Sequence, residues 1–170
     1  MLHANLQDRL KPIGIIRTPF KQSRGTPIQS SVAKGAAGTV ELFPEFEAGL
    51  KDLEEFERVW LIYQFDRAAE PQLLVRPYLD SCERGIFATR SPARPNRIGM
   101  SPVRLIGIEG RRLQVADVDI LDGTPLLDLK PYVPAFDHFP TARVGWYKNR
   151  PVNEAVADDR FEAKKTTAET

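Results

Sequence analysis

The clearest hydrophobic pattern lies in the second half of the chain. Two apolar runs, residues 103–108 and 113–120, are joined by Glu109-Gly110, a pair typical of a tight turn. This pattern predicts a β-hairpin. Residues 89–96, upstream of the hairpin, carry three hydroxyls or amides, two arginines and two prolines, with no helical period. The pattern therefore predicts polar loops held at the ends of strands.

Other apolar stretches predict a mainly β protein. We expect short strands over residues 12–17, 39–43 and 86–88. Residues 59–65 are apolar on both faces, which favours a central strand, buried on both sides or lying along a subunit contact. Its aromatic residues are interpreted as core side chains, in preference to a platform for stacking nucleotide bases.

Two segments next to these strands predict peripheral structure. Residues 44–56 place Phe46, Leu50 and Leu53 at helical spacing, so we expect a short amphipathic helix. Residues 21–38 are rich in glycine, serine, threonine and proline and predict a long loop, which in a compact domain is usually functional or disordered. A mobile lid without ligand contacts is the alternative for this loop.

Composition narrows the class of protein. The chain has 170 residues, of which 42% are apolar and 28% charged, as expected for one globular domain. Its net charge of +1 is too small to indicate nucleic-acid binding by itself. We expect an N-terminal tail over residues 1–10, a folded domain over 11–147 and a polar, frayed tail over 148–170.

Few residues are available for metal or disulfide chemistry. Cys82 is the only cysteine, which excludes an internal disulfide, and His3 and His138 are the only histidines. Asp117 and Asp119 alternate as on one face of a strand, an arrangement that we interpret as structural and not as a metal site. The N-terminus lacks the pattern of a signal peptide, and no apolar run reaches the ~20 residues that a membrane span needs. These features predict a cytoplasmic protein that binds neither metal nor membrane.

Two polar turns carry the candidate chemistry. Arg90, Arg94 and Arg97 lie close together, and arginine forks suit carboxylate or phosphate groups, although a solvated surface loop would show the same charges. In the second turn Asp122-Gly123 permits a positive φ angle. Two polar turns separated by a hairpin can lie side by side, so we expect a pocket between them.

Three stretches of sequence resemble those of a known family. Residues 12–20 read PIGIIRTPF, residues 87–101 read FATRSPARPNRIGMS, and residues 121–132 read LDGTPLLDLKPY. The second and third are long, specific words in the right order, and they look like the signatures of the TsaA-like (TrmO, YaeB) family. The resemblance extends over roughly residues 11–137.

This resemblance implies a fold and an activity. Members of the family have a single-sheeted β-barrel, form homodimers and use S-adenosyl-L-methionine to methylate N6 of threonylcarbamoyladenosine at position 37 in the tRNA anticodon loop. Longer bacterial members carry a further C-terminal domain for which this sequence has no room. The alternative is therefore a module that binds S-adenosylmethionine, or a regulator, without tRNA methylation.

The resemblance also suggests roles for individual residues. The expected cofactor-binding residues are Gln29, Ser30, Ser31, Asp66, Arg67, Arg90, Leu121, Asp122, Gly123 and Thr124. The expected substrate-binding residues are Arg94, Asn96, Arg97 and Lys130. Asp128 and Tyr132 are candidates for assisting proton loss from N6, with a structural Asp128–Lys130 ion pair as the alternative. For Asp66 and Arg67, a local ion pair at a strand end is the alternative.

Overall fold

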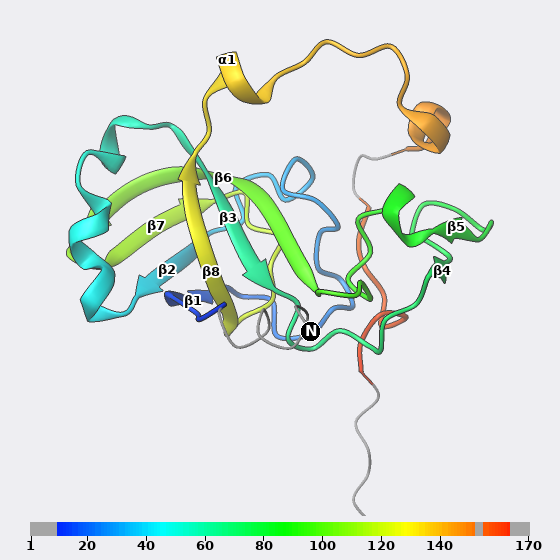
Figure 1. Cartoon of the computed structure of the whole chain (residues 1–170), viewed down its shortest axis with the longest axis horizontal. Coiled ribbons are helices and arrows are strands. Elements are labelled where there is room, and N and C mark those ends of the chain that lie inside the picture. The colour runs from blue at the N-terminus through cyan, green and yellow to red at the C-terminus, as the bar shows by residue number, and fades with distance from the viewer. Residues whose placement is uncertain (1–9, 152–154, 164–170) are drawn as a thin grey trace, which may run out of the picture.

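A closed six-stranded antiparallel barrel forms the body of the protein. The computed structural model describes residues 10–151 and 155–163. The barrel order is β1-β2-β7-β6-β3-β8, closed where β1 pairs with β8 (Figure 1). The strands are β1 (Gly14–Arg17), β2 (Gly38–Leu42), β3 (Arg58–Gln64), β6 (Ile98–Glu109), β7 (Arg112–Ala116) and β8 (Thr124–Pro131). The predicted mainly β, single-sheeted barrel is confirmed.

Alternating residues of the strands fill the interior of the barrel. In β3, Val59, Leu61 and Tyr63 are buried, whereas the residues between them are partly exposed. Small barrels have room for little but side chains, so these positions form the main core. The expectation that β3 is buried on both faces is wrong for the single chain, because Trp60 and Ile62 face outward. A subunit contact along that outer face stays a prediction.

Short helices surround the barrel. They are η1 (Pro44–Leu50), η2 (Leu53–Glu55), η3 (Ile86–Ala88), α1 (Pro134–Asp137) and η4 (Gly145–Asn149), and all but α1 are 3₁₀ helices. The expected helix over 44–56 is thus two 3₁₀ turns, since Asp52 takes a left-handed conformation with φ of 66° and interrupts the helical path. The expected strand over 86–88 is also wrong: it is a 3₁₀ turn that leaves Phe87 78% exposed.

The central hairpin is confirmed, with shifted ends. β6 and β7 are joined at Gly110, whose φ of 55° suits the turn, but β6 already begins at Ile98. β7 ends at Ala116 because Asp117 has φ of 66°, which no β-strand accommodates. The expectation that Asp117 and Asp119 share one face of a strand is therefore wrong.

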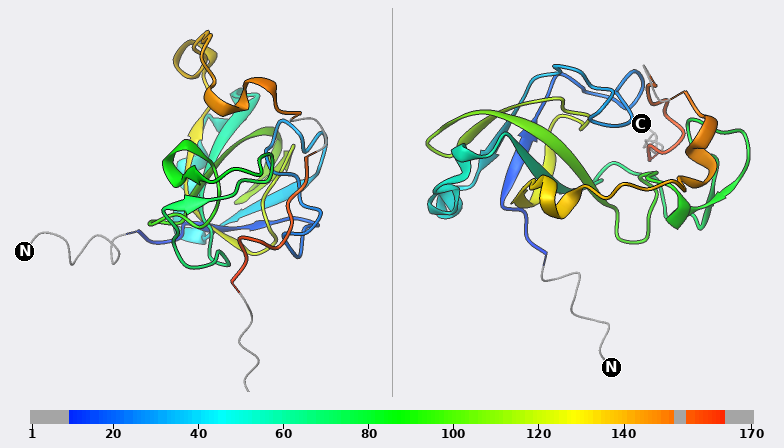
Figure 2. Two further views of the ribbon diagram at one scale, coloured as in Figure 1. Left: turned by 90° about the vertical axis from the view of Figure 1, so that its right-hand side faces the viewer. Right: turned by 90° about the horizontal axis from the view of Figure 1, so that it is seen from above.

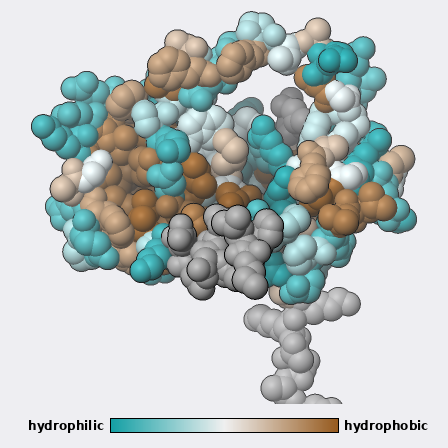
Figure 3. Space-filling view, in the orientation of Figure 1, coloured by the Kyte–Doolittle hydropathy of each residue, from teal (hydrophilic) through white to brown (hydrophobic). Residues whose placement is uncertain are grey.

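Two C-terminal segments cross the outside of the barrel. The arm, residues 133–149, arches away from β8 toward the small sheet of β4 (Leu74–Val75) and β5 (Arg84–Gly85), and an opening remains beneath it (Figures 1 and 3). At its far end the Trp146 indole N–H donates to the Ala88 carbonyl at 2.8 Å. The strap, residues 155–163, runs beside the loop of residues 21–31 (Figure 2).

The strap is ordered where we expected a frayed tail. Its backbone exchanges hydrogen bonds with Thr26 and Ile28 on one side and with Ala69 on the other. Phe161 is only 5% exposed and packs on Tyr78 with ring centroids 5.2 Å apart. One aromatic side chain in a polar segment thus supplies the apolar contact that holds the strap. Residues 1–9, 152–154 and 164–170 of the expected tails lie outside the described residues.

Candidate functional site

The two polar turns singled out in the sequence meet at one cavity. Its volume is about 610 Å³, and both Arg90 of the first turn and Leu121 of the second line it. The remaining wall comes from the loop of residues 21–31, the ends of β3 and β6, the arm and the strap. The expected pocket between the turns is therefore present in the fold.

The turn of residues 121–124 is held by its own backbone and by Asp122. Gly123 has φ of 82°, so the predicted positive φ is confirmed. Its N–H donates to the Ile16 carbonyl at 2.8 Å. The Asp122 carboxylate accepts from Lys21 Nζ at 2.7 Å and from the Thr18 N–H at 3.0 Å. The hydrogen bond from Lys21 is the main reason that the pKa of Asp122 is lowered. Asp122 and Gly123 shape the turn but do not line the cavity, whereas Leu121 and Thr124 do.

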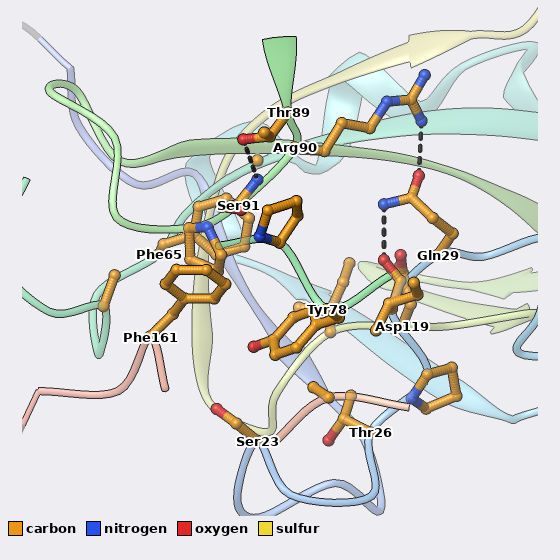
Figure 4. Close-up of a pocket in the computed structure, with 18 of the residues that line it drawn as sticks. Ser23, Thr26, Gln29, Phe65, Tyr78, Thr89, Arg90, Ser91, Asp119 and Phe161 are labelled. Atoms are coloured by element: carbon orange, nitrogen blue, oxygen red, sulfur yellow. Dashed lines mark hydrogen bonds between the residues drawn. The ribbon is translucent and has the colours of Figure 1, made fainter. Parts of the chain in front are cut away.

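The turn of residues 89–94 is braced from inside. The Arg94 guanidinium donates to the carbonyls of Thr89, at 2.8 Å, and of Ile86, at 3.2 Å, so it supports the backbone beside the cavity. This bracing leaves the neighbouring Arg90 side chain exposed and directed across the opening. Arg90 Nη1 donates to Gln29 Oε1 at 2.6 Å, which joins the turn to the loop of residues 21–31 (Figure 4).

Asp66 and Arg67 line the cavity where β3 ends. Their side chains are 4.0 Å apart, a long ion pair. Arg67 donates mainly to backbone, to the carbonyls of Lys21 and Asp122, and thereby ties both loops to the end of β3. The local ion pair considered in the sequence is thus the weakest of the contacts that Arg67 makes.

Most of the remaining predicted site residues lie away from this cavity. Ser31 lines it, but Ser30 is buried and contributes only to a neighbouring groove, which Tyr132 also lines. Asp128 and Lys130 pair at 3.0 Å on the outside of β8, as the structural alternative proposed. Asn96 and Arg97 lie beyond the rim, where Arg97 pairs with Glu70 at 2.9 Å. The functional roles of these residues stay predictions.

The sequence analysis interpreted Asp119 as structural and missed its place in the cavity wall. Asp119 lines the cavity, and its Oδ1 atom is buried without a hydrogen-bond partner among the described residues. Burial raises the pKa of Asp119 to about 6, against the opposing effects of the Ser101 hydroxyl and the Arg90 charge. Its place between two apolar residues, Val118 and Ile120, was the available signal.

Aromatic side chains make up much of the remaining wall, namely Tyr63, Phe65, Tyr78, Trp146, Tyr147 and Phe161. A largely apolar cavity with a few convergent polar groups is the usual form of a small-molecule site, and its size falls within the common range of about 300–1,000 Å³. Arg90 offers a cation for a carboxylate, and the rings offer flat surfaces for a heterocycle. These properties fit a nucleoside that carries an amino-acid side chain.

Other kinds of site find no support in the described part of the chain. Within residues 10–151 and 155–163, no three His, Cys, Asp or Glu side chains gather closely enough to hold a metal ion. No helix among the same residues is long and apolar enough to cross a membrane.

Comparisons with known proteins agree on one family. The family model described as tRNA-methyltransferase O N-terminal domain matches residues 15–138. A probable S-adenosyl-L-methionine-binding protein of Pyrococcus abyssi is 57% identical over 153 residues, which are 89% of this chain and 83% of that protein. The tRNA (adenine(37)-N6)-methyltransferase of Escherichia coli K12 is 32% identical over 92% of this chain and 71% of its own length.

The fold is shared with a solved structure. The crystal structure of TrmO from Pseudomonas aeruginosa superposes with a TM-score of 0.68 and is 43% identical. The match covers 81% of this chain but only 61% of the crystallised one, so the chain spans less than two thirds of that protein.

Proposed function

Since the chain belongs to the family of tRNA-methyltransferase O N-terminal domains, we propose that it methylates N6 of the adenine at position 37 of tRNA, with S-adenosylmethionine as the methyl donor. The name of the relative from Escherichia coli supports the reaction, and that of the Pyrococcus abyssi protein supports the donor. The single observation that carries the proposal is the cavity in which the two signature turns meet. A tRNA substrate makes the cytoplasm the place of action.

Residues on three sides of the cavity are available to hold the donor. They are Gln29, Ser31, Asp66, Arg67, Arg90, Leu121 and Thr124. The donor supplies an electrophilic methyl group, so the protein's main tasks are to align the acceptor nitrogen with that group and to exclude water. Arg90 orients a carboxylate, and the aromatic wall excludes solvent from the reacting atoms.

The acceptor that we propose is threonylcarbamoyladenosine, as the family resemblance implies. Its carboxylate suits a turn that carries several arginines: Arg94 lines the cavity, whereas Asn96 and Arg97 lie beyond its rim and Lys130 lies on the outside of β8. The planar guanidinium groups stack on bases and pair with phosphates, which suits an anticodon loop with a splayed base.

A homodimer is the second part of the proposal. The arm leaves Phe136 and Phe139 more than 70% exposed, and Val144 is 48% exposed. Neighbouring apolar side chains of this size on a thin arm are the kind of surface that a protein interface covers. We expect a second copy of the chain to pack against the arm, and in that dimer the outer face of β3 would be available for contact as well.

The direct test is methyl transfer with labelled donor. We expect label in tRNA that carries threonylcarbamoyladenosine at position 37, and little in the same tRNA without the modification. A tRNA with guanine at position 37 is the matched control. Tight donor binding with no transfer to any tRNA would contradict the enzyme and support a donor-binding module instead.

A further inference from the structure

Asp119 is a partly buried acid whose Oδ1 atom is buried and has no evident structural use among the described residues. It follows β7 between Val118 and Ile120, which are both at most 2% exposed, so its position is fixed by core packing on either side. Its carboxyl group lies in the wall of the cavity next to Gln29, which in turn reaches toward Arg90 (Figure 4).

Asp117, two residues away, shows what a structural acid in this segment looks like. Its carboxylate accepts from the Gly35 N–H at 2.8 Å and from Arg58 Nη2 at 3.0 Å, and Arg104 is 3.6 Å away. Both of its oxygens are therefore used. Asp119, by contrast, has an Oδ1 atom with no partner among the described residues.

An unpartnered carboxylate oxygen is costly in an apolar wall. Burying a polar group without a hydrogen bond opposes folding, and burying a charged group without one opposes it more strongly. Groups of this kind concentrate at functional sites, where a ligand supplies the missing partner. The cavity beside Asp119 is the place from which such a partner can come.

The surroundings of Asp119 suit a proton acceptor. The Ser101 hydroxyl lies 3.2 Å from the Tyr63 hydroxyl, and hydrogen bonding by Ser101 lowers the pKa of Asp119. Tyr63, Ser101 and Asp119 thus form a polar chain below the cavity. Among the described residues, the charged or titratable groups facing Asp119 are Arg90, from the turn, and Tyr63, from β3. Arg90 is already engaged with Gln29 and does not neutralise Oδ1 through a hydrogen bond.

We infer that Asp119 is the general base of the proposed methyl transfer: its carboxylate accepts the proton that leaves the acceptor nitrogen. The inference rests on the proposed function. The N–H bond breaks, and its electron pair stays on nitrogen when the proton moves to Asp119. Nitrogen uses an electron pair to form the new bond to the methyl carbon. The carbon–sulfur bond of the sulfonium donor breaks with its pair going to sulfur, which becomes a neutral thioether. The charges and atoms balance without another reactant.

The protonation state agrees with this role. With its pKa raised by burial to about 6, Asp119 is mostly ionised at neutral pH and is a stronger base than an exposed carboxylate. The rate of the chemical step should therefore rise as pH increases through about 6, since only the ionised form accepts a proton.

The test compares Asp119→Asn with a matched control, Asp52→Asn. Asp52 is an exposed aspartate beside η2, and asparagine tolerates its left-handed conformation. We expect Asp119→Asn to lower the single-turnover rate at least about 100-fold, to abolish the rise of rate with pH, and to leave donor affinity measured by calorimetry within about threefold. Asp119→Glu should retain partial activity, and Asp52→Asn should match the wild type.

Measurements other than turnover distinguish the loss of a base from misfolding or from the loss of donor binding. Carbon-13 NMR should detect an aspartate that titrates near pH 6 in the wild type and not in Asp119→Asn, with thermal unfolding showing that both are folded. A wild-type rate and pH profile in Asp119→Asn would overturn the inference, as would a loss of donor binding large enough to account for the lost rate. If the wild type methylates no tRNA, the proposed function itself fails, and the role of Asp119 fails with it.

Discussion

At the scale of single residues, Arg90 is the predicted ligand-binding residue whose role is simplest to test. It is exposed, belongs to no core cluster, and forms a 2.6 Å hydrogen bond to Gln29 across the cavity opening. Arg90→Ala should keep the melting temperature of the wild type and raise the Kd for the donor about tenfold or more, because a charged hydrogen bond contributes roughly 1.5–3 kcal/mol. Calorimetry with S-adenosylmethionine measures this, with Arg112→Ala on β7 as the control. An unchanged isotherm and rate would remove Arg90 from the site.

Asp117 gives a prediction about stability at the same scale. Burial alone would raise the pKa of its carboxyl group, but the Gly35 N–H, Arg58 and Arg104 outweigh burial and lower it. A lowered pKa means that the stabilisation is complete above the unfolded pKa of about 4 and is lost progressively as pH falls from there through the lower pKa of the folded state. Asp117→Asn should thus lower the free energy of unfolding by about 1–3 kcal/mol at pH 7, and the deficit should shrink in acid. Urea unfolding at pH 7 and pH 3 checks this, and a deficit independent of pH would contradict it.

Arg90 and Asp119 also show what single-sequence reasoning could reach. The position of Arg90 followed from its turn, because charge and prolines marked that loop. The position of Asp119 did not, since a left-handed Asp117 ends β7 early and turns the following residues out of the strand period. The positive φ of Asp117 is not marked in the sequence, so the apolar neighbours Val118 and Ile120 were interpreted as the continuation of a strand.

At the scale of elements, the strap holds the loop of residues 21–31. The N–H groups of Gly25 and Ile28 donate to strap carbonyls at 2.9 and 3.2 Å, and the Glu162 carboxylate accepts from the Ser23 N–H and hydroxyl at 2.8 Å. The apolar anchor of this arrangement is Phe161, which packs with Val75, Ile86 and Ala93 in a small cluster. The strap therefore supports one wall of the cavity.

Phe161→Ala should release the strap without unfolding the barrel. Truncating a buried phenylalanine costs roughly 3–5 kcal/mol, and here the loss falls on a cluster outside the main core. Hydrogen exchange at the Gly25 and Ile28 amides should become faster, while amides within β3 and β6 keep their protection. Phe136→Ala, on the exposed arm, is the control. Equal acceleration in the barrel strands would show that the strap belongs to the same cooperative unit.

The elements themselves were predicted unevenly. Strands of the barrel were recognisable because their alternation or apolar runs are local, and the hairpin at Gly110 was marked by its turn residues. The short helices were recognised only in part. Helical spacing marked residues 44–56, where η1 and η2 lie, but η3 has the composition of a strand, and its conformation is fixed by the Thr89 hydroxyl and by Arg94, which both bond to the Ile86 carbonyl. The strap was missed because its order depends on one aromatic residue in a polar sequence.

At the scale of the whole molecule, the barrel and the arm differ in how far their apolar side chains are buried. The barrel is closed, and 14 buried residues form its core cluster within one chain. The arm returns to the body only near η4 and displays its aromatic side chains to solvent. A chain with a complete core and an uncovered apolar arm is suited to associate through the arm.

The arm thus leads to a prediction about assembly. Wild-type protein should have the mass of two chains in light scattering at micromolar concentration, and Phe136→Ser combined with Phe139→Ser should have the mass of one. The double variant should keep the melting behaviour of the barrel, because neither side chain contributes to the core. Phe87→Ser, another exposed aromatic on η3, is the matched control and separates the arm from general surface hydrophobicity. A wild-type mass of one chain would exclude the dimer, whereas a dimeric double variant would move the contact to another face, such as the outer side of β3.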